Sequence, residues 1–167
     1  MPLPDDPAAV LTRMLHAIDV LDWAEVRACL ADEVRTDYTE LFGGEAETVS
    51  GDDLVTRWQG LLPGFDATQH LTGPVLVEQV SGEDGAWQGA GLRLRTHVRG
   101  YHRIEGAEGG PVWAVHGHYV VPLRETDAGW RIAGITLQVF YQEGNTGLPE
   151  LAARRATTSP RTIPAAG

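Results

Sequence analysis

The sequence contains no lysine, because all 13 of its basic residues are arginine. This absence excludes a lysine Schiff base and a P-loop lysine as the chemical centre of the protein. The accompanying abundance of alanine, glycine and arginine is typical of a GC-rich genome. The absence of lysine therefore excludes these two kinds of catalytic centre, but it does not indicate a fold.

Cysteine is almost as scarce, since Cys29 is the single one in the chain. One cysteine cannot form an internal disulfide, and it has no CxxC partner for a metal site. It lies within residues 23–30, where the apolar residues have helical spacing. A buried, unreactive thiol is therefore expected here in preference to a nucleophile.

Positive charge is in deficit, with 23 acidic residues and a net charge of −10. Binding to nucleic acid or to an anionic membrane would need a local basic patch, and no basic cluster stands out. No stretch approaches the length of a membrane span, and the first residues lack a positive segment. We therefore expect a cytoplasmic protein without a nucleic-acid or membrane partner.

The usual cofactor motifs are also missing. No glycine-rich segment places GxGxxG or GxxxxGK[ST] between a strand and a helix, so nothing supports nucleotide binding. Ser50, Ser81 and Ser159 lie in cap, loop and tail contexts, without the residues of a nucleophile elbow. We expect no cofactor.

The first third of the chain is predicted to be largely helical. Asp6-Pro7 begins a helix that ends near Leu21, with apolar residues recurring on one face. Asp22 caps a second helix through residue 30, and residues 34–39 are typical of a short strand. A third helix is expected from residue 50 to residue 62, stopped by Pro63-Gly64.

From residue 67 the apolar pattern changes to that of strands. The predicted strands span residues 67–80, 86–104, 112–125 and 130–142, separated by polar, glycine-containing loops. Helices followed by antiparallel strands predict an α+β fold, with the helices packed on one face of the sheet. Glycines within the strands, at positions 89, 91, 100 and 117, predict a strongly curved sheet that encloses a pocket.

The end of the chain completes a single predicted domain. Residues 148–155 are expected to form a last short helix, and residues 157–167 are predicted to be a disordered tail. We therefore expect one domain, residues 1–156.

A few polar residues stand among apolar ones and are candidates for chemistry. Asp19 lies at a predicted helix C-terminus, where the macrodipole disfavours a carboxylate, so a buried partner or solvent must compensate its charge. His116 and His118 flank Gly117 on one face of a strand, whereas the opposite face is more apolar and is a candidate core. The two histidines could also ligate a metal, with His70 or Asp19 as a third ligand, but no other feature reinforces that site.

Several segments together resemble a known family. They are residues 21–27, Asp37-Tyr38, residues 68–70, residues 117–119 and residues 127–132. Their order and spacing over roughly residues 8–145 resemble the SnoaL-like branch of the nuclear-transport-factor-2-like (NTF2-like) superfamily, most closely scytalone dehydratase and its bacterial relatives. The resemblance implies a cone-shaped α+β fold in which N-terminal helices pack on a curved, mostly antiparallel sheet.

The resemblance also implies a set of site residues. Asp19 would orient His70 as the general acid and base, His116 would assist, and Tyr38 would polarise a substrate carbonyl. Ile18 stands where the dehydratase pattern has another tyrosine. The implied function is a cofactor-independent acid–base lyase or isomerase, acting on a cyclic, apolar, carbonyl-bearing metabolite such as a polyketide or a steroid-like compound. For the substrate contacts we expect Trp58, His118 and Phe140.

A second hypothesis is a non-catalytic module for small-molecule binding or dimerisation. In that case His116 and His118 lie at a subunit interface and His70 is structural. A homodimer or small homo-oligomer is expected in either case. Convergence of Asp19, Tyr38, His70 and His116 on one cavity would favour the enzyme.

Overall fold

The computed structural model describes residues 6–81 and 91–163. Its helices are α1 (Pro7–Asp19), α2 (Trp23–Cys29), α3 (Thr39–Phe42), α4 (Gly51–Gln59) and α5 (Leu148–Thr158), with a 3₁₀ turn, η1 (Leu62–Gly64). Its strands are β1 (Leu30–Asp37), β2 (Glu47–Ser50), β3 (Ala67–Thr72), β4 (Leu76–Val80), β5 (Gly91–Arg103), β6 (Val112–Thr126) and β7 (Gly129–Gly144).

Side-chain caps fix the starts of the three predicted N-terminal helices. The carboxylate of Asp6 accepts a hydrogen bond from the Ala8 N–H at 3.0 Å, and that of Asp22 accepts one from the Glu25 N–H at 3.1 Å. Ser50 caps α4 in the same way. These caps satisfy N–H groups that have no partner within the helix, so each helix begins where the sequence predicted.

The strands form one mixed sheet with the order β2-β1-β7-β6-β5-β3. Among these pairs β1 and β7 run parallel, and the others are antiparallel. The predicted strand 67–80 is two strands, β3 and β4, which both pair with β5 on either side of a break at Gly73-Pro74. Proline cannot donate a ladder hydrogen bond, which accounts for the break. Residues 86–90 of the next predicted strand lie outside the described residues.

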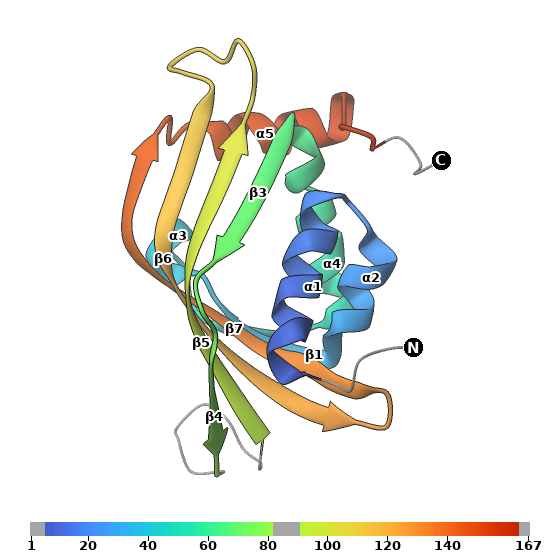
Figure 1. Cartoon of the computed structure of the whole chain (residues 1–167). Coiled ribbons are helices and arrows are strands. Elements are labelled where there is room, and N and C mark those ends of the chain that lie inside the picture. Colours follow the sequence, from blue (N-terminus) through green and yellow to red (C-terminus); the bar gives the residue numbers. More distant parts are fainter. Residues whose placement is uncertain (1–5, 82–90, 164–167) are drawn as a thin grey trace.

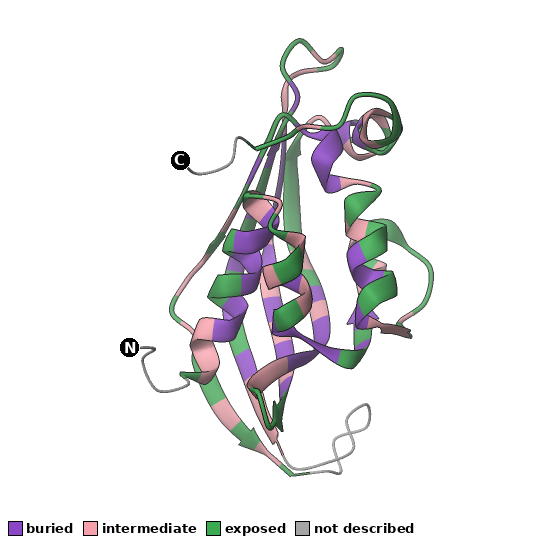
Figure 2. Cartoon of the chain, turned by 90° about the vertical axis from the view of Figure 1, so that its right-hand side faces the viewer, coloured by how far each residue is buried: buried purple, intermediate pink, exposed green. Residues whose placement is uncertain are grey.

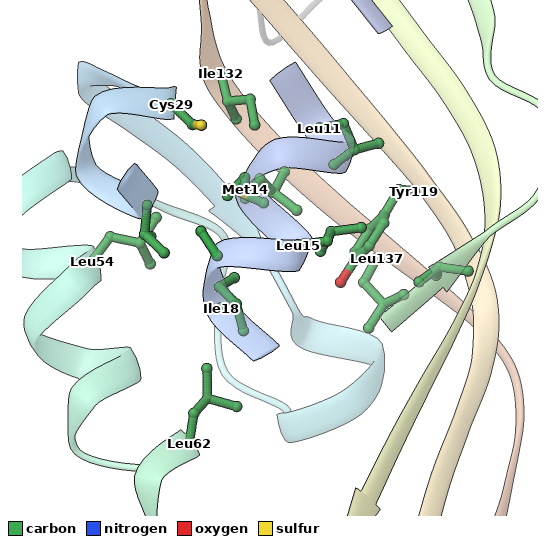
Figure 3. Packing of buried hydrophobic residues seen from close by; sticks show 14 of the residues in the cluster. Leu11, Met14, Leu15, Ile18, Cys29, Leu54, Leu62, Tyr119, Ile132 and Leu137 are labelled. Carbon is green, nitrogen blue, oxygen red and sulfur yellow. The ribbon is translucent and has the colours of Figure 1, made fainter. Parts of the chain in front are cut away.

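The sheet is strongly bent, and helices α1, α2 and α4 cover its concave face (Figure 1). Buried residues concentrate between the helical layer and the sheet (Figure 2). The apolar face of α1 supplies much of this core, with Leu15 directed toward Tyr119 of β6 and Leu137 of β7 (Figure 3). The predicted α+β class and curved, mostly antiparallel sheet are confirmed.

The end of the chain differs from the prediction. Helix α5 runs to Thr158, past the predicted limit of residue 155, and it buries Leu148 and Ala152 fully on its inner side. Beyond it, the Arg161 N–H donates a hydrogen bond to the Pro63 carbonyl at 2.7 Å. Residues 157 and 158 of the predicted tail are therefore helical and Arg161 is bonded to η1, whereas residues 164–167 lie outside the described residues.

Over residues 6–81 and 91–163, no helix has the length and apolarity needed to cross a membrane.

Candidate active site

A cavity of about 120 Å³ lies between the helical layer and the concave face of the sheet. Most of its wall is apolar. Helix α1 contributes Met14, Leu15 and Ile18, α3 contributes Leu41 and Phe42, and α4 contributes Trp58. The polar side chains of the wall are Tyr38, His70, His102 and Tyr119. Such a lining, with a few convergent polar groups, is typical of small-molecule sites.

Asp19 and His70 form a hydrogen-bonded pair at this cavity. Asp19 Oδ1 lies 2.8 Å from Nδ1 of His70, and Asp19 Oδ2 accepts the His70 backbone N–H at 2.7 Å. Thr68 donates its hydroxyl to Asp19 Oδ1 at 2.9 Å. The side chains of Asp19 and His70 are only 15% and 11% exposed, so solvent screens the pair weakly. The pair joins the last residue of α1 to β3.

These contacts keep Asp19 ionised. Burial raises the pKa of Asp19, but the hydrogen bonds and charge of His70, together with the Thr68 bond, outweigh it and hold that pKa below its ordinary value. An ionised carboxylate can only accept, so neutral His70 carries its proton on Nδ1. The lone pair on Nε2 is then free to take a proton from a bound molecule.

His102 of β5 is the second histidine of the cavity. Its ring lies 4.5 Å from that of Trp113 and 4.8 Å from that of Phe65, and it meets the His70 ring edge-on at 5.5 Å. Burial, aided by the charge of His70, lowers the pKa of His102 to about 3. Its Nδ1 lies 3.3 Å from the Trp113 carbonyl oxygen, which can only accept a hydrogen bond. His102 is therefore a neutral ring near pH 7.

A glycine makes room for the imidazole of His102. Gly100 of β5 is the cross-strand partner of His70, and both residues line the cavity. A Cβ at this position would lie 3.2 Å from Cε1 of His102 and 3.5 Å from Nε2 of His70. The glycine therefore leaves room for the His102 ring, which a Cβ would crowd, whereas His70 would meet a Cβ at an ordinary contact distance.

Two tyrosines provide hydroxyl groups on another part of the wall. Tyr38 and Tyr119 both line the cavity, and each influences the pKa of the other. Burial raises the pKa of Tyr119 to about 12 and that of Tyr38 well above its ordinary value. Both hydroxyls are therefore protonated near neutral pH. A protonated hydroxyl is a donor, so a tyrosine of this wall can donate to an oxygen atom of a ligand.

The structure brings together four of the predicted site residues. Asp19 and His70 are bonded, and His70, Tyr38 and Trp58 line the same cavity. His116 is not at this site. It lies on the opposite, outer face of the sheet, where its Nε2 is 2.7 Å from Glu143 and its ring stacks on Tyr141 at 4.2 Å.

His118 and Phe140 are likewise on the outer face. The prediction that they contact a substrate in the cavity is therefore wrong. Their rings lie 6.0 Å apart, and Phe140 is 59% exposed. The reason is strand alternation: His116, His118 and Val120 of β6 face outward, while Val115, Gly117 and Tyr119 face the core. The metal hypothesis has no support either, because the described part of the chain has no cluster of three or more metal-ligating side chains.

His102 was missed, although the sequence carries a signal for it. Residues 93, 95, 99 and 103 are arginines at odd positions of β5, whereas residues 94, 96, 98, 100 and 102 are small, apolar or histidine. Arginines on alternate residues mark the solvent face of a strand, so His102 belongs to the inner face. The structure has this pattern, with the even positions buried from Leu94 to His102.

The fold and the site together define a class: a curved-sheet α+β domain whose apolar cavity holds a carboxylate-oriented histidine. The SnoaL-like domain profile matches residues 8–136. The chain therefore belongs to the SnoaL-like domain family, within the NTF2-like superfamily. This confirms the resemblance inferred from the sequence.

Comparisons with individual known proteins agree with this family membership. The chain is 27% identical over 142 residues to the scytalone dehydratase-like protein Arp1 of Metarhizium guizhouense, covering 75% of this chain and 73% of that protein. It is 26% identical over 156 residues to a dehydratase of Pestalotiopsis microspora, covering 86% and 92%. The solved structure of the Kfla4162 protein of Kribbella flavida superposes with a TM-score of 0.76 at 23% identity, covering 86% of this chain and 94% of that one.

Proposed function

We propose that the protein is a cofactor-independent lyase or isomerase that uses general acid–base catalysis on a cyclic, apolar, carbonyl-bearing metabolite, such as a polyketide or a steroid-like compound. The Asp19–His70 pair at the wall of an apolar cavity carries this proposal. The relatives named as dehydratases support the reaction type.

In a dehydration, His70 acts first as the base. Its Nε2 takes the proton from the carbon next to the substrate carbonyl, and the electron pair of that C–H bond moves into an enolate. The enolate then re-forms the carbonyl as the C–O bond to the leaving hydroxyl breaks. The proton on His70 passes to that hydroxyl, so water leaves and the histidine returns to its starting state.

Asp19 remains a carboxylate throughout. Its bonds to Nδ1 and to the backbone N–H of His70 hold the ring and fix the tautomer. It also stabilises the positive charge that His70 carries between the two proton transfers. A proton returned to another carbon would instead give an isomerisation, which requires no additional group.

The tyrosine pair is assigned to the carbonyl oxygen. With raised pKa values, Tyr38 and Tyr119 both keep their protons, so one of the two hydroxyls can donate its proton. A hydrogen bond from it stabilises the negative charge of the enolate oxygen. The apolar wall from Leu15, Ile18 and Leu137 favours a hydrocarbon ring over a sugar or a nucleotide.

The test uses a panel of cyclic β-hydroxyketones in D₂O. Dehydration is followed by the new absorbance of the conjugated ketone, and proton abstraction by deuterium incorporation next to the carbonyl. Wild-type protein is expected to catalyse at least one of these changes, and His70→Asn is expected to lose about a hundredfold or more of the rate.

The matched control is His116→Asn, which removes a carboxylate-bonded histidine from the other face of the sheet. It should retain the wild-type rate. No turnover or exchange by wild-type protein across the panel, with the ligands still bound, would favour the non-catalytic binding module. Equal losses in the two variants would refute His70 as the base.

The proposal includes a homodimer or small homo-oligomer. Leu71, Phe140 and Tyr141 are each more than half exposed on the outer face of the sheet, which supports association through that face. Light scattering during size-exclusion chromatography should give more than one chain per particle, and Phe140→Asp should reduce that number. A monomer at all concentrations would contradict this part of the proposal.

A further inference from the structure

The segment after α5 returns to the body of the protein directly behind the Asp19–His70 pair. The backbone N–H of Arg161 is bonded to the Pro63 carbonyl at 2.7 Å, which fixes the segment on η1. From there the Arg161 side chain reaches the junction of α1 and β3. It is partly buried in this position. The C-terminal segment thereby contacts the two elements that supply the two halves of the pair.

Each terminal nitrogen of the guanidinium has its own acceptor. One donates to the backbone carbonyl of Asp19 at 3.2 Å, and the other to the hydroxyl oxygen of Thr68 at 3.4 Å. The same Thr68 hydroxyl donates to Asp19 Oδ1. Arg161 therefore braces the main chain of Asp19 directly and its carboxylate through Thr68.

The Asp19 carbonyl is available because α1 ends there. In a longer helix this carbonyl would accept the N–H of Trp23, but that N–H is bonded to the carbonyl of Leu21. Leu21 has a φ of 56°, a left-handed conformation of the kind that commonly ends a helix. The guanidinium thus occupies the C-terminal end of α1.

Charge gives this contact a second role. The negative end of the α1 dipole disfavours the Asp19 carboxylate, and a cation at the same end opposes that effect. Burial lowers the pKa of Arg161, whereas the charges of Asp19 and Asp66 raise it, and the guanidinium remains a cation. The other titratable groups around Asp19 are His70 on β3, His102 on β5 and Tyr119 on β6.

The placement of Arg161 is also costly. Its Nε is buried and has no hydrogen-bond partner among the residues that the structure describes. The backbone bond to Pro63 could be made by any residue except proline. A partly buried arginine with an unpaired buried nitrogen is therefore a poor anchor and is better explained by what its two terminal nitrogens hold.

We propose that Arg161 is a positioning residue for the acid–base pair, holding the end of α1 and Thr68 so that the Asp19 carboxylate stays bonded to Nδ1 of His70. This inference rests on the proposed function for its catalytic meaning. Without Arg161, the carboxylate loses its orientation, and neutral His70 redistributes its proton between its two ring nitrogens. The histidine then presents a lone pair to the cavity for a smaller share of the time.

The test measures the tautomer of His70 by ¹⁵N NMR at alkaline pH, where the ring is neutral. Arg161→Gln is expected to change the ratio of the two tautomers about fivefold toward the Nε2–H form, the loss expected for one hydrogen bond. Arg161→Lys keeps the positive charge but lacks the two terminal nitrogens that donate to separate acceptors, so it should give an intermediate tautomer ratio. A wild-type tautomer ratio in Arg161→Gln would overturn the proposal. Should that variant not fold, a wild-type ratio in Arg161→Lys would do so.

The matched control is Arg155→Gln. Arg155 also ties the C-terminal region to the body, through its 2.6 Å ion pair with Asp66, and within the described part of the chain it has no hydrogen bond or ion pair with Asp19, Thr68 or His70. It should lower the melting temperature and leave the tautomer ratio unchanged. If Arg155→Gln shifts the ratio as much as Arg161→Gln does, Arg161 acts only by docking the segment, and the proposal is wrong.

The tautomer needs no substrate, so this result is independent of the lyase assay. A chain without turnover whose His70 tautomer still depends on Arg161 would refute the proposed function and leave the positioning role in place. Where turnover is found, Arg161→Gln should lower kcat about fivefold with little change in KM, because ligand contacts are intact.

Discussion

The two faces of the sheet each carry a histidine bonded to a carboxylate, and the bonds are nearly the same length. On the concave face Nδ1 of His70 lies 2.8 Å from Asp19, and on the outer face Nε2 of His116 lies 2.7 Å from Glu143. The inner carboxylate is 15% exposed, whereas the outer one is 56% exposed. The distance alone does not distinguish a candidate active site from a surface contact.

What differs is the number of bonds that hold each carboxylate and what surrounds the ring. Asp19 accepts the His70 backbone N–H and the Thr68 hydroxyl in addition to the imidazole. The His116 ring lies against Tyr141 in an open groove. Fixed orientation and weak solvent screening make the inner pair suited to proton transfer, and the outer pair is suited to surface contacts.

The largest expected difference between the pairs is in activity. Asp19→Asn should lower kcat/KM by about a hundredfold or more, because His70 loses both its orientation and the charge that stabilises its protonated form. Glu143→Gln makes the equivalent change on the outer face and should alter kcat/KM less than about twofold. Steady-state kinetics on the same substrate measure both. Similar losses would remove the distinction between the faces.

A smaller effect is expected from crowding His102 on the inner face. Gly100→Ala adds a Cβ 3.2 Å from His102, so that ring must shift, whereas His70 Nε2 at 3.5 Å stays in ordinary contact. The His102 ring packs edge-on against His70, so its displacement should loosen the base and lower kcat about tenfold while the fold is retained. Circular dichroism checks the fold, and turnover measures the loss. An unchanged kcat would mean that the base does not depend on how the His102 ring packs against it.

The next expected effect is on the pH dependence of the unfolding free energy, to which the buried His102 of the inner face contributes. Burial lowers its pKa from 6.5 to about 3, so between these values the unfolded chain binds a proton that the folded protein does not. Stability therefore falls as the pH is lowered through this window. Between pH 7 and pH 5 the part due to His102 should be about 2 kcal/mol of unfolding free energy. Urea unfolding of wild type and His102→Gln measures it, and equal losses in both would contradict the buried neutral ring.

The smallest effect belongs to the outer ion pair. Glu143 is largely in solvent, so Glu143→Gln should change the unfolding free energy by less than about 0.5 kcal/mol at neutral pH. Urea denaturation is again the measurement. A loss above 1 kcal/mol, near the top of the range for exposed pairs, would show that the outer pair is more than a surface contact.

The order of the long elements could be predicted from sequence because their periodicity is strong. The apolar face of α1 and the capping residues Asp6, Asp22 and Ser50 marked the N-terminal helices, and the change of period at residue 67 marked the sheet. Helix α3 and strand β2 have four residues each, too few for a periodic signal. The parallel pairing of β1 with β7 joins residues about a hundred positions apart, which no local pattern contains.

The site was predictable only in part, for a related reason. Asp19 and His70 could be paired by resemblance, but the choice between His102 and His116 depends on which strand face is buried. Alternation in β6 already placed His116 opposite the more apolar face, and the arginines of β5 placed His102 inside. Arg161 lies 142 residues from Asp19 in sequence, so no spacing could connect them.

The central claim is that a ligand binds and reacts on the concave face. Its most direct test is a histidine-ring NMR spectrum recorded during titration with 1-tetralone, an apolar bicyclic ketone. A ligand on the concave face should shift the ring signals of His70 and His102 with a common saturation curve while those of His116 do not move. Saturable shifts of His116 alone, with His70 and His102 unchanged, would place the ligand on the outer face and rule out binding at the inner cavity.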